Sequence, residues 1–73
     1  MRGDRNAERH RHTLTGTLRW TGLGYALEMD DGGVWQLDVG WEWNAGRSVG
    51  RRVTVEGVRS GFDLLDVYRL YAA

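Results

Sequence analysis

YALEMDDGGVWQLDV, residues 25–39, is the stretch that decides the fold. Apolar residues occupy every second position on both sides of an Asp/Gly cluster, and such alternation around a turn is a strong hairpin signal. The sequence therefore predicts two antiparallel strands with one apolar face. The side chains expected to face the core are Tyr25, Leu27, Met29, Trp35, Leu37 and Val39. The side chains expected on the outer face are Ala26, Glu28, Val34, Gln36 and Asp38.

Three further strands are predicted at residues 12–20, 51–59 and 64–71, each rich in β-branched or apolar residues. Gly16 falls in the middle of the first strand, where a glycine is costly unless the backbone bends or another segment approaches closely. Trp20 shares the parity of the apolar residues of this strand and is expected in the core, like Trp35. In the last strand Leu70 breaks the alternation, which predicts a bulge near Tyr68 or Arg69.

Five short strands in 73 residues indicate an all-β fold. An open sheet would leave two edges unpaired, so closure is favoured. Three strands in a meander, a longer link at residues 40–50 and a final hairpin predict a small Greek-key barrel of the OB type. An SH3-like barrel, which also has five short strands, is the second choice. We expect a flexible basic arm at residues 1–11 and one barrel domain at residues 12–73, with room for one helical turn at residues 43–49.

The composition limits the classes of protein that the chain can represent. Without cysteine it has neither disulfides nor thiolate metal sites to supplement a small core. No apolar run approaches the roughly 20 residues that a membrane helix needs. The polar N-terminus has no signal-peptide core, so we expect a cytoplasmic location.

Charge is balanced overall but segregated along the chain. Ten arginines face ten carboxylates, and lysine is absent. Residues 24–42 hold five carboxylates and no base, whereas residues 47–59 hold four arginines and one glutamate. Because nucleic-acid binding depends on phosphate neutralisation, a neutral chain with an acidic hairpin makes such binding possible but disfavoured.

The run GRRVTVEGVRSGFDLLDV, residues 50–67, resembles a family of short bacterial proteins of unknown function that are usually regarded as OB-like. Residues 15–18 and 32–37 fit the same pattern, so the resemblance covers roughly residues 12–70. The sequence departs from the family pattern around residues 41–44. The resemblance implies an OB-like fold, and it implies no activity or catalytic residue.

Two tryptophans in the link are the first candidates for a binding site. Trp41 and Trp43 flank Glu42 in a glycine-bounded segment where the pattern gives no inward phase. One interpretation is that they cap the open end of the barrel, where burying two indoles would supply several kcal/mol. The other is an exposed aromatic patch for a protein partner or small ligand.

A group of four arginines in and after the link forms the second candidate site. It consists of Arg47, Arg51, Arg52 and Arg59. They are interpreted either as a solvated rim that pairs with the acidic hairpin or as contacts for an anion or nucleic acid.

Metal and catalytic sites are not predicted. His10 and His12 form a His-x-His pair without a third ligand nearby in sequence, so no metal is assigned. Asp30, Asp31 and the pair Asp63 and Asp66 lie at or beside turns, where Asp is favoured, with no neighbouring nucleophile or base. We therefore expect neither catalysis nor a cofactor.

The sequence thus favours a small non-catalytic interaction module that contacts a protein partner through the link between the third and fourth strands. The contact residues predicted for it are Trp41, Trp43, Arg47, Arg51 and Arg52. The alternative is weak binding of single-stranded nucleic acid by the N-terminal arm and residues 47–59.

Overall fold

The computed structural model describes residues 10–40 and 45–73, which form five strands and one 3-10 turn. Each predicted strand is present and differs from the prediction by one residue at one end. The elements are β1 (Arg11–Trp20), β2 (Tyr25–Glu28), β3 (Val34–Asp38), η1 (Ala45–Ser48), β4 (Arg52–Arg59) and β5 (Leu64–Ala72).

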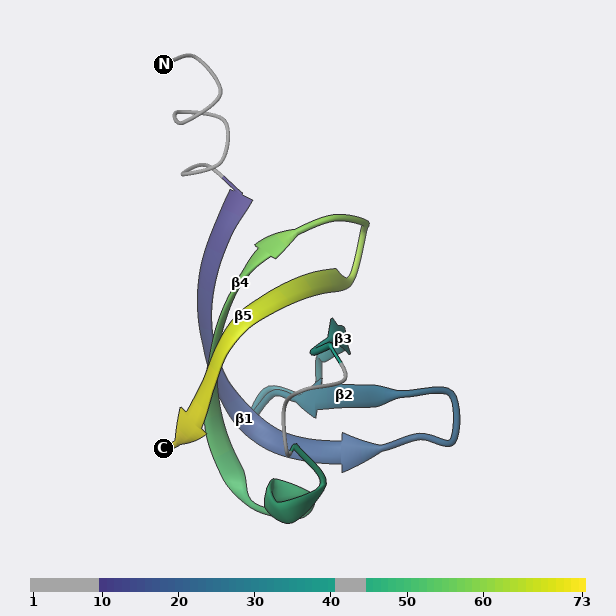
Figure 1. Cartoon of the computed structure of the whole chain (residues 1–73), viewed down its shortest axis with the longest axis vertical. Helices are drawn as coiled ribbons and strands as arrows, with labels where there is room; N and C mark the ends of the chain where they lie inside the picture. Colours follow the sequence, from purple (N-terminus) through teal and green to yellow (C-terminus); the bar gives the residue numbers. More distant parts are fainter. Residues whose placement is uncertain (1–9, 41–44) are drawn as a thin grey trace.

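The strands make one mixed sheet in the order β1-β2-β3-β5-β4, and this sheet closes on itself because β4 also pairs with β1. Four of the pairings are antiparallel, and β3 pairs with β5 in parallel. Closure leaves no long unpaired edge, which removes the main aggregation hazard of a small sheet. The turns after β1 and after β4 project to the same side of the molecule, with β3 between them (Figure 1).

Closure depends on a close approach at Gly16. β1 pairs with β4 up to Thr17 and with β2 from Thr17 onward, so the strand passes from one neighbour to the other at this point. A Cβ on Gly16 would overlap the backbone carbonyl of Glu28 and lie 3.1 Å from a Leu27 side-chain carbon. The expectation that a glycine here permits a close approach is therefore confirmed.

The core lies inside the closed sheet and follows the predicted alternation. The hairpin phase is confirmed: half of its predicted inward side chains are buried, and Tyr25, Met29 and Trp35 are half-buried against the core. Ala26 is buried although it has outward parity, because its short methyl lies between Arg19 and Gln36 on the flanking strands. The buried cluster consists of Leu18, Leu27, Leu37, Val39, Ala45, Val53, Val55, Leu65 and Val67.

The prediction that Trp20 belongs to the core is wrong. This last residue of β1 is 58% exposed and packs edge-on against Tyr25, with ring centroids 5.0 Å apart. At this point β1 pairs only with β2, and the hairpin extends beyond the closed part of the sheet (Figure 1). The described strands leave the indole uncovered, so parity alone does not bury it.

The predicted bulge is confirmed at Tyr68. Glu56 pairs with Arg69 and the next residue, Gly57, pairs with Val67, so Tyr68 is the extra residue on β5. This insertion shifts the alternation by one residue. Leu70 therefore packs against the core although it does not share the parity of Leu65 and Val67.

Candidate functional site

The predicted contact residues divide into two groups. Trp41 and Trp43 lie outside the described residues. Arg47, Arg51 and Arg52 are described, and all three are exposed at the end of the sheet where η1 lies. η1 falls within the segment predicted to hold one helical turn, and its Ala45 is buried in the core.

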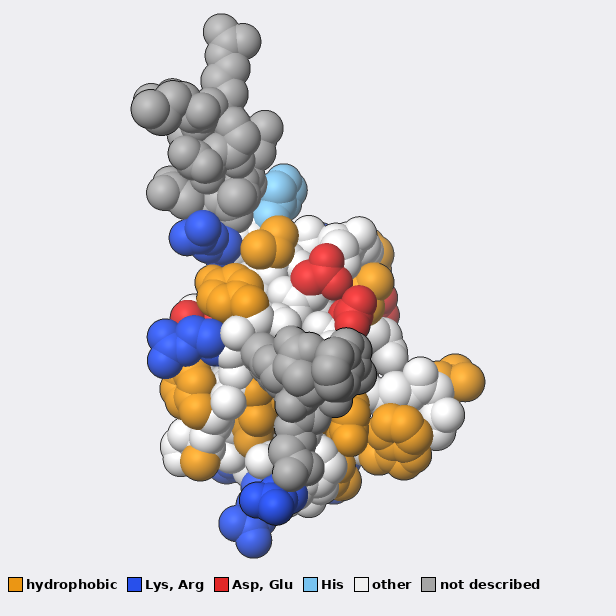
Figure 2. Space-filling model, viewed as in Figure 1, with side chains coloured by type: hydrophobic (Ala, Val, Ile, Leu, Met, Phe, Trp, Pro, Cys, Tyr) orange, Lys and Arg blue, Asp and Glu red, His pale blue; other side chains and the backbone are white. Residues whose placement is uncertain are grey.

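The backbone of the link is tied to β1 just before β4 begins. The N–H of Leu18 donates to the carbonyl of Arg51 (3.0 Å), and the N–H of Gly50 donates to the carbonyl of Leu18 (2.7 Å). Arg51 therefore has a fixed backbone position, while its side chain extends into solvent. Arginine side chains (blue) appear at this lower end of the molecule in Figure 2.

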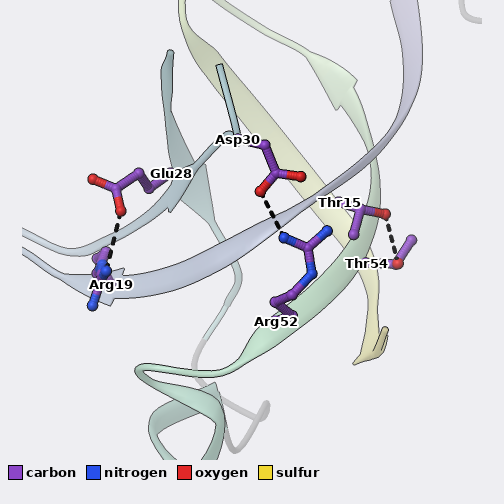
Figure 3. A network of polar contacts seen from close by, with 6 residues as sticks. All are labelled: Thr15, Arg19, Glu28, Asp30, Arg52 and Thr54. Atoms are coloured by element: carbon purple, nitrogen blue, oxygen red, sulfur yellow. Dashed lines mark hydrogen bonds and ion pairs between the residues drawn. The ribbon is translucent and has the colours of Figure 1, made fainter. Parts of the chain in front are cut away.

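Arg52 is already engaged by the acidic hairpin. Its Nη1 donates to Oδ1 of Asp30 at 2.6 Å, across β1 (Figure 3). This hydrogen bond and the attraction between the charges lower the pKa of Asp30 and raise the pKa of Arg52. Of the two interpretations of the arginines, pairing with the acidic hairpin is the one that the geometry gives for Arg52.

Arg59 does not belong to the same surface as the other arginines. It ends β4, whereas Arg52 begins it. At about 3.3 Å per residue, the seven steps between them separate their backbones by about 23 Å. The basic run of the sequence is therefore split between the two ends of β4.

At its own end Arg59 lies among aromatic rings. Its guanidinium carbon is 5.9 Å from the centroid of Trp35 and 5.7 Å from that of Phe62, within the range of cation–π attraction. The centroid of the His12 ring is 5.3 Å from that of Trp35. We call His12, Trp35, Arg59 and Phe62 the Arg59 cluster.

The outer side of β2, β3 and β5 is acidic, as the sequence predicts for the hairpin. Asp38 on β3 and Asp66 on β5 are partners in the parallel register, and both are exposed because their neighbours Leu37 and Leu65 point inward. Glu28 on β2 is also exposed and forms an ion pair with Arg19 at 3.1 Å. We call Glu28, Asp38 and Asp66 the acidic face. A polyphosphate backbone would be repelled here.

A nearly fully exposed apolar side chain marks each of the two turns beside this face. Leu23, in the turn after β1, is 99% exposed, and Phe62, in the turn after β4, is 90% exposed. Hydrophobic side chains (orange) reach the edge of the molecule where the β1–β2 hairpin ends (Figure 2). We call Leu23 and Phe62 the turn tips.

Both turns are held by hydrogen bonds. The Thr21 hydroxyl donates to the Gly24 carbonyl (2.9 Å) and accepts from the Leu23 N–H (3.2 Å). In the other turn Arg59 donates from Nε to the Gly61 carbonyl (2.9 Å) and from Nη2 to the Phe62 carbonyl (2.8 Å). The tips are therefore presented on defined backbones.

Both tips lie in the connections left between the predicted strands, at residues 21–24 and 60–63, and the sequence alone gave them no role. The signal that could have found them is a large apolar residue between glycines or polar residues, in Thr-Gly-Leu-Gly and Ser-Gly-Phe-Asp. An apolar residue inside a turn is outside the alternating pattern and has no assigned place in the core.

Comparison with known proteins gives a family. The model of a family described as "Protein of unknown function (DUF5818)" matches residues 15–73. The chain belongs to the DUF5818 family. Searches of curated proteins and of solved structures find no significant match. The family model covers all five strands except the start of β1, and it includes both turn tips and the acidic face.

Two further properties concern only residues 10–40 and 45–73. None of their His, Asp or Glu side chains gather in threes where a metal ion would bind. Within the same residues there is no helix with the length and apolar character needed to cross a membrane.

Proposed function

We propose that this DUF5818 chain is a non-catalytic interaction module, an OB-like barrel that binds a protein partner through the two turn tips and the acidic face between them. The closed order β1-β2-β3-β5-β4 supports the OB type, with a meander, a link containing η1 and a returning hairpin. In OB barrels the face of strands two and three and the loops after strands one and four form the usual binding surface. The turn tips lie in those loops.

The observation that carries the proposal is the exposure of Leu23 and Phe62. Burying a Leu or Phe side chain is worth about 1.5–3 kcal/mol each, and neither residue obtains this within the described fold. Aromatic and apolar anchors on ordered backbones are typical of the residues that dominate protein interfaces. A partner that covers both tips would gain that burial without reorganising the turns.

The acidic face indicates the charge of the partner. Asp38 and Asp66 are exposed next to each other, and neither forms an ion pair among the described residues. Basic side chains of a partner would relieve this repulsion and steer the encounter. Of the contact residues predicted from sequence, Arg47 and Arg51 stay in the proposal as exposed charges in and just after η1, and Arg52 leaves it because it pairs with Asp30.

The test is affinity capture from the source cells with the full chain and two variants. Leu23→Ser combined with Phe62→Ser removes both tips. Val49→Ser, which changes an exposed apolar residue beside η1, is the matched control. We expect the chain and the control to retain the same protein, and the double variant to lose it. Equal retention by the double variant, with its thermal unfolding unchanged, would rule out the tips as the contact.

Binding of single-stranded nucleic acid is the second candidate, and Arg47 and Arg51 favour it. Both are exposed, and neither forms an ion pair with another described residue. If this candidate is correct, a mixed-sequence oligonucleotide will change the tryptophan emission at low salt. The effect will decline steeply with added salt and disappear in Arg47→Ala with Arg51→Ala. Under the partner proposal, emission stays constant.

A further inference from the structure

We infer that the Arg59 cluster is a carboxylate-binding site, and that its natural ligand is a carboxylate of the partner protein. The inference rests on the proposed function for the source of the carboxylate, but the site itself can be tested without any partner. It adds an anchoring point of opposite charge at one end of the acidic face.

The first step is the fixed orientation of the guanidinium. Nε and Nη2 form one edge of its planar fork, and both donate to carbonyls of the following turn, those of Gly61 and Phe62. An arginine fork has a second pair of parallel N–H groups, on Nη1 and Nη2, at its other end. That pair has no acceptor among the described residues. Arg59 therefore offers a ready edge for a two-oxygen acceptor.

The second step is the missing counter-charge. The ion pairs of the described residues involve Arg19, Arg52 and Arg69, and none involves Arg59. Asp63, only four residues away, is exposed, and its backbone carbonyl accepts from the N–H of Gln36 at 2.7 Å. A positive group held in place without an anion is the pattern expected of a ligand site.

The third step is the aromatic surroundings. The rings of Trp35 and Phe62 are both within 6 Å of the guanidinium, and Trp35 is half-buried against the core. Rings in these positions displace water from the guanidinium, which strengthens its interaction with an anion. Phe62 remains 90% exposed, so an apolar group attached to the carboxylate can pack on it.

The acidic face decides between a carboxylate and a nucleic-acid phosphate. A polynucleotide bound at Arg59 would carry further charges past Asp63, Asp66 and Asp38, with repulsion at each. A protein chain brings one carboxylate to Arg59 and can present basic residues to the acidic face. The combination favours a peptide with a carboxylate at one end of its contact and basic residues along the rest.

The experiment titrates the isolated full chain with benzoate, a carboxylate attached to a flat apolar ring, and follows the arginine Nε–H and tryptophan indole N–H signals by NMR. We expect millimolar binding that shifts the signals of Arg59 and Trp35. Arg59→Lys keeps the charge but has no fork, and it should weaken binding about tenfold or more. Arg52→Lys, at the other end of β4 and outside the proposed surface, is the matched control and should leave binding unchanged.

Two further measurements are needed. One distinguishes loss of the binding site from loosening of the turn, and the other compares carboxylate with phosphate as the ligand. Phe62→Ala leaves the Arg59 fork intact and should weaken benzoate more than acetate, because only benzoate has a ring to pack. No shift in the wild-type chain at tens of millimolar benzoate would overturn the inference. So would binding unaffected by both variants, or tighter binding of inorganic phosphate or an oligonucleotide. None of these results bears on the capture test of the turn tips.

Discussion

The substitution Gly16→Ala tests the point at which β1 passes from β4 to β2. The added methyl would meet the carbonyl group of Glu28, which is backbone and cannot rotate away like a side chain. β2 would have to move outward, which disturbs the pairing of Thr17 with Glu28 and of Leu18 with Leu27. Overpacking of this kind costs typically 1–3 kcal/mol, and a rigid neighbour places the expected cost at about 2–3 kcal/mol.

This cost is large for a chain of 73 residues. At 0.05–0.15 kcal/mol per residue the whole domain has about 4–11 kcal/mol of stability. Since 1 kcal/mol shifts the midpoint of a domain of this size by about 4–8 °C, Gly16→Ala should lower the melting temperature by roughly 10–20 °C. Thermal and urea unfolding, followed by circular dichroism, measure the effect directly.

Gly46→Ala in η1 is the matched control. Its added methyl would lie 3.4 Å from the Tyr25 hydroxyl, an ordinary contact, and apart from its neighbours along the chain no backbone atom of the described residues lies within 4 Å. We expect a change of less than about 1 kcal/mol, in the stabilising direction, because alanine restricts the unfolded chain. If Gly16→Ala unfolds within 0.5 kcal/mol or so of the wild type, the close approach does not limit the fold and the reasoning fails.

Three other substitutions test separate parts of the structure. Leu65→Ala, in the centre of the core, should lower the free energy of unfolding in urea by about 2–5 kcal/mol. Leu64→Ala, one residue away and exposed, should lower it by less than about 1 kcal/mol. Equal losses would contradict the strand phase. Asp30→Asn should reduce the loss of stability in acid. The lowered pKa of Asp30 stabilises the fold above the unfolded pKa of this group, and that stabilisation is lost as the pH falls through the folded pKa. An unchanged acid limb of the pH–stability curve would exclude this. The phenol of Tyr71 donates to Glu56 at 2.8 Å, and this raises the pKa of Tyr71. An ultraviolet titration should therefore show a late step, above the ordinary tyrosine pKa, that Tyr71→Phe removes. The stabilisation is present below the unfolded pKa near 10 and is lost as the pH rises through the folded value, and a titration in which Glu56→Gln leaves the late step unchanged would assign its cause elsewhere.

The strands were predictable because their signals are local. Alternation with period two around Asp30-Asp31-Gly32-Gly33 determines a hairpin without knowledge of any other segment. The bulge at Tyr68 was predictable for the same reason, since a one-residue insertion reverses the parity of the side chains on one strand. Trp20 was mispredicted because parity gives the direction of a side chain and does not say whether another layer covers it.

The grouping of charges was less predictable, because it depends on strand register. Arg52 and Asp30 are 22 residues apart in sequence and meet only because β2 and β4 flank β1. Arg52 and Arg59 are close in sequence, yet an extended strand places them at opposite ends of the sheet. Proximity along the chain is therefore a poor guide to a charged surface in a β protein.

The Arg59 cluster also depends on strand register, which here brings residues from distant parts of the sequence together. His12 belongs to β1, Trp35 to β3 and Arg59 to β4, and Phe62 follows in the next turn. No sequence motif links these residues. Pairing of His12 with Gly57 brings the start of β1 beside the end of β4, and pairing of Gln36 with Leu64 brings the start of β3 beside the same turn. Only closure of the sheet assembles the cluster.

The distribution of apolar residues supports the proposal that a partner binds at the turns. A domain of this size has little core to spare, and its described core consists mainly of Leu and Val side chains from the five strands. Leu23 and Phe62 add nothing to that core, and each lies in a turn whose backbone is fixed by hydrogen bonds. Under the proposed function, a partner surface that covers both tips would account for two large apolar residues there. The guanidinium beside Phe62, which has no ion-pair partner among the described residues, would then align that surface.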